Sequence, residues 1–426
     1  MNKRTKTALR QWCLYGWTFV KWTMAASAIG VVCGLIGTMF HFGVHEVTAF
    51  RGTHPWVLYL LPLAGFVIMS FYKLTETDGL GTDDIIDAVH EGKRLPILLL
   101  PAIFFGTVLT HLCGGSAGRE GAALQMGGTI GQCMGRTFRL DDRDLRVATL
   151  AGMAAFFSAL FGTPLAATVF AIMVISIGVL YHVALYPSLL AALVAYGVSV
   201  RLGVEPTRFT VAVPDQSVGM FVRVAALGVL CALVSILFCK LMHGAGHLMK
   251  RIKNPWLRVI CGGFAVIALT WIFGTDYNGA GMDIVTRAIE QETVAVPWAF
   301  LLKLVFTAVT LAAGFKGGEV VPSFFVGATF GCAVSPLLGL PVGFGAAVGL
   351  AAVFCGVTNC PVASTLLAVE LFGAEGMLYF ALACCLSYML SGYQGLYSSQ
   401  TILYSKLKAQ FINVHTNAYH AGEKTE

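Results

Sequence analysis

The sequence predicts an all-α membrane protein with many spanning and partly spanning helices. Hydrophobic residues make up 57% of the 426-residue chain, charged residues only 12%, and the mean hydropathy is +0.76. A soluble domain carries about 25% charged residues, so this composition excludes an ordinary soluble fold. Apolar stretches recur along the whole chain, which indicates a polytopic protein embedded in lipid.

Many of the apolar stretches are interrupted or short. Several fall below the roughly 20 residues that a straight span needs, and Gly or Pro breaks others. Short, broken apolar segments are typical of discontinuous transmembrane helices. In chain order the stretches are Trp12–Phe40, Pro55–Tyr72, Leu98–Cys113, Leu145–Leu160, Pro164–Leu180, Val183–Val200, Met220–Met242, Val259–Phe273, Val296–Ala313, Phe324–Leu338, Phe344–Phe354, Pro361–Phe372 and Met377–Leu390.

Basic residues flank the apolar stretches unevenly. Lysines and arginines precede the first stretch, between Lys3 and Arg10, which places the N-terminus in the cytoplasm by the positive-inside rule. Residues 136–146, residues 250–258 and the tail after Lys406 are also basic, so we expect them, and hence both termini, inside. The net charge of +6 lies mostly in these flanks. It suits lipid headgroups and gives no indication of nucleic-acid binding.

The segment Gly115–Gly131, GSAGREGAALQMGGTIG, places the charged pair Arg119-Glu120 between glycines in apolar surroundings. An ionisable side chain within the membrane indicates a functional site, because burying charge in lipid is costly. The glycines favour a break followed by a new helix, whose first N–H groups and positive dipole end would attract an anion. The alternative is a cytoplasmic loop with an incidental Arg-Glu pair.

Cysteine and histidine patterns predict neither metal nor cofactor. The 12 cysteines are scattered through the apolar runs without a CxxC pair, as expected for small core residues. The pairs His41/His45 and His243/His247 have the i, i+4 spacing of helical metal ligands. Neither pair lies in an HExxH motif, so we expect these histidines at the level of the lipid headgroups.

The chain contains an internal repeat. GMAAFFSALFGTPLAATVFAIMV begins at Gly152, and GLAAVFCGVTNCPVASTLLAVEL begins at Gly349. Upstream, GGTIG ending at Gly131 matches GATFG ending at Gly331. Each half therefore has a glycine-rich segment with an acidic residue, followed by a Gly-Ala-Ala helix and a proline-started helix. Such repeats with broken helices are typical of transporters, whose substrates bind where the repeats meet.

These residues resemble the CLC family of chloride channels and proton-coupled antiporters. Gly118–Gly121 followed by QMGGTIG looks like the family's GREGP segment. Gly79–Asp83 aligns with GSGIP, Gly318–Pro322 with GxFxP, and Gly395–Ser399 with the segment that carries the anion-coordinating tyrosine. The resemblance covers most of the chain.

The resemblance implies a homodimer with one pathway per subunit and inverted repeats. It implies a CLC-type transmembrane domain over residues 12–408, with repeats at about 12–202 and 218–408. Residues 1–11 and 409–426 are then cytoplasmic segments at the two ends.

The chain departs from the chloride-transporting pattern at three places. Leu80 replaces the serine of GSGIP, Glu319 replaces an apolar residue, and the internal proton-transfer glutamate is missing near Met173 or Val174. Together with Tyr397-Ser398-Ser399-Gln400, the first two departures resemble the fluoride/proton antiporter branch. Within that branch, Val321 stands where a threonine is expected.

The resemblance and the helix starts predict the following site. Glu120 acts as a gate that occupies the anion site as a carboxylate and leaves it when protonated. Glu319, if protonated, donates a hydrogen bond to fluoride and could replace the missing proton relay. The predicted anion-binding residues are Gly79, Leu80, Gly81, Arg119, Gly121, Ala122, Glu319, Val320 and Tyr397.

The sequence therefore predicts a fluoride/proton antiporter in a bacterial plasma membrane. The nearest alternative is a chloride channel or chloride/proton antiporter with the same fold. An alternative of another class is an intramembrane enzyme that uses Glu120 and Glu319 as a carboxylate pair. We find no Ser-His pair, HExxH motif or nucleophile elbow, which argues against an enzyme.

Overall fold

The computed structural model describes residues 3–293 and 296–417, so the last nine residues of the predicted tail, 418–426, lie outside it. The helices are α1 (Lys3–Thr53), η1 (Pro55–Leu60), α2 (Leu61–Leu74), α3 (Thr82–Glu91), α4 (Leu99–Leu112), α5 (Glu120–Thr137), α6 (Asp142–Phe161), α7 (Pro164–Met173), η2 (His182–Ala184), α8 (Leu185–Arg201), α9 (Val218–Met249), α10 (Pro255–Phe273), α11 (Met282–Glu290), α12 (Ala299–Ala313), α13 (Val320–Leu338), α14 (Val342–Thr358), α15 (Pro361–Phe372) and α16 (Met377–Leu390). The strands are β1 (Ser176–Ile177), β2 (Thr401–Tyr404) and β3 (Phe411–His415).

The helices have the mixed lengths that the broken apolar stretches predict. Seven of the described helical segments are long and apolar enough to cross a membrane, and six further apolar helices have only 10–17 residues. The short ones include α7 and α15, which both begin with a proline at the first helical position. Proline is well tolerated there because that N–H has no partner within the helix. The chain is thus a multi-pass helical membrane protein, as predicted.

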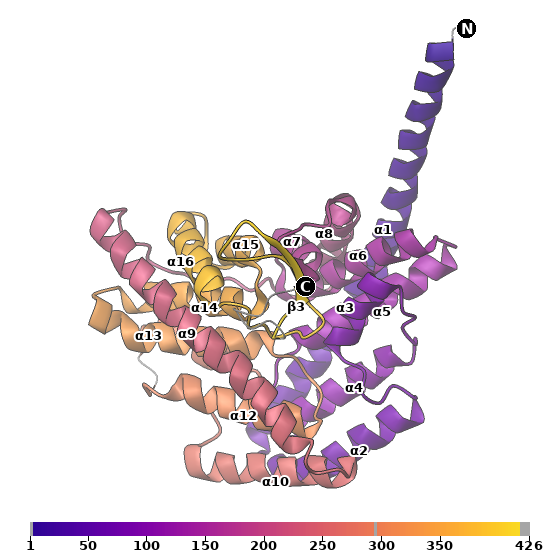
Figure 1. Cartoon of the computed structure of the whole chain (residues 1–426). Coiled ribbons are helices and arrows are strands. Elements are labelled where there is room, and N and C mark those ends of the chain that lie inside the picture. Colours follow the sequence, from indigo (N-terminus) through magenta and orange to yellow (C-terminus); the bar gives the residue numbers. More distant parts are fainter. Residues whose placement is uncertain (1–2, 294–295, 418–426) are drawn as a thin grey trace.

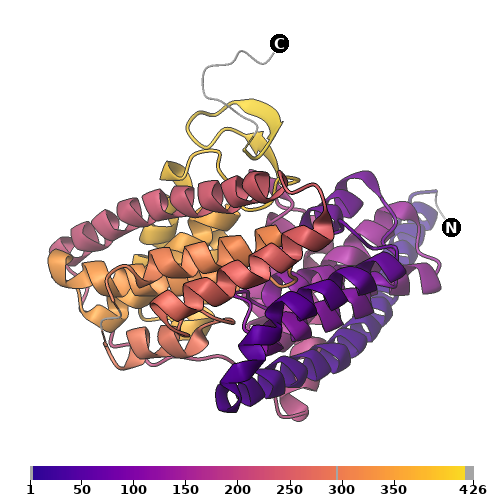
Figure 2. The same ribbon diagram turned by 90° about the horizontal axis from the view of Figure 1, so that it is seen from below.

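The two halves of the sequence lie side by side. In Figures 1 and 2, α1 to α8 occupy one side of the molecule and α9 to α16 the other. Equivalent helices make equivalent contacts, because α5 packs mainly on α6 and α13 packs mainly on α14. This pairing follows the repeat that the sequence predicts.

Repeated glycines make the two main helix crossings possible. A Cβ atom on Gly152 of α6 would lie 2.9 Å from the Cα of Gly131 on α5. At the equivalent crossing, a Cβ atom on Gly349 of α14 would lie 3.0 Å from the Cα of Gly331 on α13. Any side chain at these positions would push the helices apart, since protein interiors are close-packed. The same requirement, close contact between two helices, therefore explains why all four of these repeated positions are glycine.

The two halves meet at the segments that precede α5 and α13. Gly118 and Gly318 form an antiparallel bridge, in which each N–H donates to the other's carbonyl at 2.7 Å. Behind this bridge, Phe324 of α13 contacts Phe161 of α6 and Phe354 of α14, with ring centroids 5.7 and 5.1 Å apart. The bridge fixes the starts of α5 and α13 next to each other.

A small sheet accompanies the helices. β2 pairs with β1 in parallel and with β3 in antiparallel register. The sheet therefore joins the chain after α7 to the residues after α16, and the predicted domain boundary at residue 408 falls between β2 and β3. The sequence analysis did not predict this sheet.

Candidate functional site

Three predicted helix starts are found where the glycine motifs place them. Gly81, Arg119 and Glu319 are the N-cap residues of α3, α5 and α13. The first N–H groups of a helix lack partners within it, and the helix dipole adds partial positive charge there. The geometry thus provides anion-attracting helix ends without a formal charge.

Glu120 is the first residue of α5, and its side chain is 1% exposed. Its Oε2 accepts a hydrogen bond from the backbone N–H of Arg119 at 2.9 Å. Its Oε1 lies 3.4 Å from the Arg119 Nε, which forms an ion pair. The carboxylate is therefore held by the start of its own helix and by the neighbouring guanidinium.

A cavity of about 490 Å³ adjoins this carboxylate; we call it the Glu120 cavity. Arginines and histidines from α1, α4, α11 and the N-cap of α5 lie in its wall, together with three carboxylates. Its charged and histidine residues are His41, His45, Arg51, His111, Arg119, Glu120, Asp276, Asp283 and Arg287.

The structure adds a contact for His41 and His45 that the sequence did not predict. Both line the Glu120 cavity, and their expected position at the headgroup level stays a prediction. The Arg119 Nη1 lies 3.0 Å from Nδ1 of His41, and the two imidazole rings stack with centroids 6.4 Å apart. Because an arginine only donates, His41 Nδ1 is the acceptor in this contact. His41 therefore helps to orient Arg119, which in turn pairs with Glu120.

Glu319 lines a second cavity of about 260 Å³, which we call the Glu319 cavity. Leu80 and Tyr397 line the same cavity, so three predicted site residues from distant parts of the sequence come together. A Cβ atom added to Gly121 would lie 3.4 Å from the Glu319 Oε2, which places that carboxyl beside the first turn of α5. The absence of a side chain at Gly121 thus lets Glu319 approach the helix that begins with Glu120.

Tyr397 presents a hydroxyl group without a partner. Its side chain is 3% exposed, and its hydroxyl makes no hydrogen bond within the described residues. A buried hydroxyl that lacks a partner costs free energy, so nearly all such groups in proteins are satisfied. Since Tyr397 lines the Glu319 cavity, an anion there would be a suitable acceptor.

The remaining predicted residues offer only backbone groups or form part of the cavity wall. Gly79 and Gly81 line the Glu319 cavity, but the Gly81 N–H already donates to Asp84 at 2.8 Å. Ala122 and Val320 are fully buried in the first turns of α5 and α13, so only their backbone N–H groups could face an anion. Their roles in binding stay predictions.

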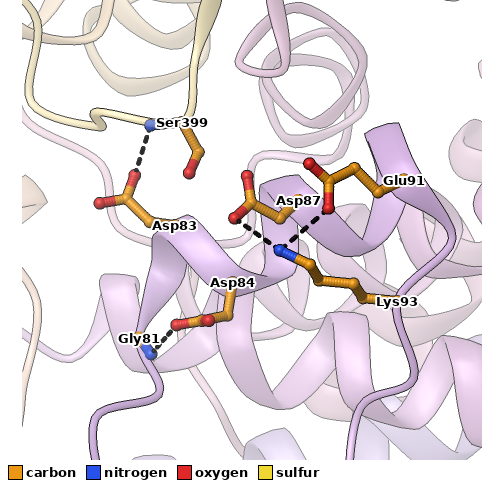
Figure 3. A network of polar contacts seen from close by, with 7 residues as sticks. All are labelled: Gly81, Asp83, Asp84, Asp87, Glu91, Lys93 and Ser399. Atoms are coloured by element: carbon orange, nitrogen blue, oxygen red, sulfur yellow. Dashed lines mark hydrogen bonds and ion pairs between the residues drawn. The ribbon is translucent and has the colours of Figure 1, made fainter.

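The acidic residues of α3 make different contacts, as Figure 3 shows. Asp84 caps the helix through Gly81, and Asp87 pairs with Lys93 at 3.5 Å. Asp83 is half-buried. Its Oδ1 accepts from the Ser399 N–H at 3.0 Å, so it ties α3 to the segment that carries Tyr397.

Glu370 of α15 has a structural contact with α7. Its two carboxylate oxygens accept from the N–H groups of Leu165 and Ala166 at 3.1 and 2.8 Å. These are the first N–H groups of α7, so a side chain from α15 caps a helix of the other half.

Two further residues of the Glu319 cavity were missed by the sequence analysis. Tyr72 and Lys316 both line it, from α2 and from the loop before α13. Lys316 carried a signal, because it is a lone cation between the apolar α12 and the Gly-Gly-Glu motif. Tyr72 carried none, since a tyrosine near the end of an apolar run is usually interfacial.

Comparison with known proteins identifies the family. The family model described as "Voltage gated chloride channel" matches residues 63–392, which is most of the chain. The chain therefore belongs to the voltage-gated chloride channel family, the CLC family that the glycine motifs resemble.

Relatives within this family carry two kinds of name. A protein of Pseudomonas syringae pv. tomato named "Chloride/fluoride channel protein" is 38% identical over 91% of this chain and 87% of its own. A Vibrio vulnificus protein named "H(+)/Cl(-) exchange transporter ClcA" is 25% identical over 87% of this chain and 86% of its own.

Solved structures share the fold. The crystal structure of a CLC-type fluoride/proton antiporter is 32% identical, with a TM-score of 0.88 over 91% of this chain and 99% of that chain. A slow cyanobacterial Cl⁻/H⁺ antiporter is 19% identical, with a TM-score of 0.75 over 87% of this chain and 94% of that chain. The second likeness supports the fold alone.

Proposed function

We propose that this protein is a fluoride/proton antiporter, a secondary active transporter that exports fluoride in exchange for protons. The observation that carries the proposal is the position of Glu319. It lines one cavity with Leu80 and the unpartnered Tyr397 hydroxyl. The resemblance implies an apolar residue and a serine at the first two positions in chloride transporters. The similarity to a fluoride/proton antiporter structure supports the same choice.

The chemistry of this cavity suits fluoride. Fluoride is small and strongly hydrated, so a site must replace its water by close, strong donors. A protonated Glu319 and Tyr397 each offer an O–H group, and the helix starts offer N–H groups. Leu80 offers no donor. It replaces the serine whose hydroxyl the resemblance implies for chloride transporters, so we expect its presence to weaken the binding of chloride more than that of fluoride.

Glu120 is the gate in this proposal. As a carboxylate it competes with fluoride for helix-terminal N–H groups. Protonation removes its negative charge, so the neutral acid is no longer attracted to these groups and yields its place to the anion. The residue lines the Glu120 cavity and begins α5, whose first turn Glu319 approaches, and both observations support this role. One group that alternately takes a proton and yields to an anion couples the two movements.

The assembly and location follow from the resemblance and the flanking charges. We place the protein as a homodimer in a bacterial plasma membrane, with both termini in the cytoplasm. Basic residues near the N-terminus and in the tail after Lys406 support this orientation.

The alternative is a chloride channel or chloride/proton antiporter. The Vibrio relative's name favours it, and so does the channel name of the Pseudomonas relative. Leu80 and Glu319 count against it, since both alter positions that the resemblance assigns to chloride coordination.

Proton uptake driven by a fluoride gradient tests the proposal. Liposomes that contain the purified protein are loaded with fluoride and diluted into fluoride-free buffer, and the external pH is recorded. An antiporter takes up protons as fluoride leaves, even against a proton gradient. Fluoride efflux without proton movement would identify a channel, and no efflux would reject both transport modes for fluoride.

A further inference from the structure

Lys316 and Tyr72 form a pair in the wall of the Glu319 cavity. The Lys316 Nζ lies over the Tyr72 ring, 4.1 Å from its centroid. Lys316 precedes α13 and Tyr72 belongs to α2, so the fold brings the pair together across both repeats. Such a cation over an aromatic face is an attractive contact, which fixes the ammonium relative to the ring.

Gly106 of α4 leaves the space that this pair occupies. A Cβ atom there would lie 3.1 Å from Cγ of Lys316 and 3.2 Å from Cε2 of Tyr72. The lysine stem and the tyrosine ring therefore both pack against the bare backbone of α4. This packing holds the lysine side chain in the wall of the Glu319 cavity.

Among the described residues, neither polar end of the pair has a hydrogen-bond acceptor or an ion-pair partner. The Tyr72 side chain is 1% exposed, and its hydroxyl has no hydrogen-bond partner among residues 3–293 and 296–417. In the same part of the chain, the four ion pairs within 4.0 Å do not involve Lys316. At longer range Asp78 and Asp84 attract its ammonium, and Arg258 repels it.

A buried hydroxyl costs free energy when it has no acceptor, and a half-buried ammonium favours a nearby anion. One small anion could accept from both, since the hydroxyl belongs to the ring over which the ammonium lies. We propose that the Lys316 ammonium and the Tyr72 hydroxyl form a binding site for a small monovalent anion in the Glu319 cavity. This site uses other donors than the Tyr397 hydroxyl, in the same cavity, and rests on the proposed function for its ligand, fluoride.

The site would bind the anion before it reaches Tyr397, and we call it the loading site. A formal positive charge raises the local anion concentration in a cavity with low-dielectric walls. The anion then passes to neutral donors at Tyr397 and the helix starts, which bind it weakly enough to release it. Two sites in succession allow entry to be favourable and exit to stay fast.

Transport kinetics of Lys316→Met test the proposal. This change removes the ammonium and keeps an unbranched stem beside Gly106. We expect the KM for fluoride to rise roughly ten- to a hundred-fold, the effect of losing one charged donor, while the maximum rate falls less than about threefold. Fluoride efflux from liposomes is measured over a range of internal concentrations.

Lys73→Met is the matched control. Lys73 also lies over an aromatic ring, with its Nζ 4.9 Å from the Trp256 centroid, but it is exposed and does not line the Glu319 cavity. It should leave the KM unchanged. Equal KM values for Lys316→Met and Lys73→Met, in samples that transport fluoride, would overturn the proposal.

Tyr72→Phe is the second variant, and it decides the matter if Lys316→Met does not fold. The hydroxyl has no partner to lose, so thermal stability should be unchanged or higher. We expect the KM for fluoride to rise roughly two- to ten-fold, the effect of one neutral hydrogen bond. An unchanged KM in a stable Tyr72→Phe protein would refute the hydroxyl's part in the site.

The failure of this inference and that of the proposed function are distinguishable. If the unmutated protein transports no fluoride, the proposed function is wrong whatever the variants do. If it transports fluoride and neither variant changes the KM, the proposed function stands and the loading site is wrong.

Discussion

At the scale of single residues, the contacts of Glu120 support its proposed role as a gate. Its carboxylate is buried and accepts from the N–H of Arg119, while the adjacent guanidinium offsets its charge. His41 holds that guanidinium from the other side. Movement of the carboxylate therefore breaks few contacts, and protonation weakens both the hydrogen bond and the ion pair.

The first prediction concerns Glu120→Gln. The amide has nearly the same shape as the carboxylate but cannot release a proton, so proton-coupled exchange should vanish. Fluoride-driven proton uptake into liposomes measures the effect. Glu375→Gln, which changes an exposed glutamate in the loop before α16, is the control and should behave like the unmutated protein. Proton pumping at the native rate in Glu120→Gln would show that another residue is the gate.

The second prediction concerns Glu319→Ala. Removing the carboxyl group leaves the Glu319 cavity without the donor that we assign to fluoride, so fluoride transport should be lost or reduced at least tenfold. A fluoride-selective electrode measures efflux from loaded liposomes. Unchanged fluoride efflux would mean that Glu319 only starts α13.

The sequence predicted those residues whose chemistry conflicts with their surroundings. A carboxylate between glycines in an apolar stretch marks Glu120, and Gly-Gly-Glu marks Glu319. His41 and Tyr72 could not be placed in this way. Tyrosine is common near the end of an apolar helix, and the partner of each residue, Arg119 or Lys316, lies far away in the chain. Local patterns carry no information about contacts of that range.

At the scale of elements, glycines decide how closely the helices approach. The crossing of α5 and α6 leaves no room for a Cβ atom at Gly152, and α13 and α14 repeat this geometry at Gly349. The sequence predicted the repeat because glycine and proline recur in register. It did not predict the sheet of β1, β2 and β3, whose strands are two to five residues long and distant in the chain.

The third prediction concerns Gly152→Ala. The added methyl group would meet the backbone of α5, so the crossing must widen, at a cost of roughly 1–3 kcal/mol. The thermal unfolding midpoint in detergent should fall. Gly197→Ala on α8 is the control, because a Cβ atom there has no neighbour within 4 Å. Alanine is the better helix former, so that midpoint should stay or rise.

This pair of variants separates packing from helix propensity. If Gly152→Ala is as stable as Gly197→Ala, α5 and α6 are not in the close contact described. Close helix contact would then not explain the repeated glycines.

At the scale of the whole molecule, the large lipid-facing surface leaves room for assembly. Exposed apolar side chains such as Leu233 and Phe264 cover the outer faces of α9 and α10. The fourth prediction, which follows from the family resemblance, is a homodimer with a separate pathway in each subunit. Light scattering in mild detergent should return twice the subunit mass. A monomer mass with transport intact would contradict the prediction.

The central claim is that the cavities serve fluoride in preference to chloride. The most direct measurement compares the efflux of the two anions from liposomes that contain the unmutated protein, recorded with ion-selective electrodes under identical gradients. Loss of one donor to a buried anion costs roughly 1.5–3 kcal/mol, which is about one to two decades in affinity. Fluoride efflux should therefore exceed chloride efflux at least tenfold. Equal rates for the two anions would contradict the fluoride assignment and favour a chloride transporter of the same fold.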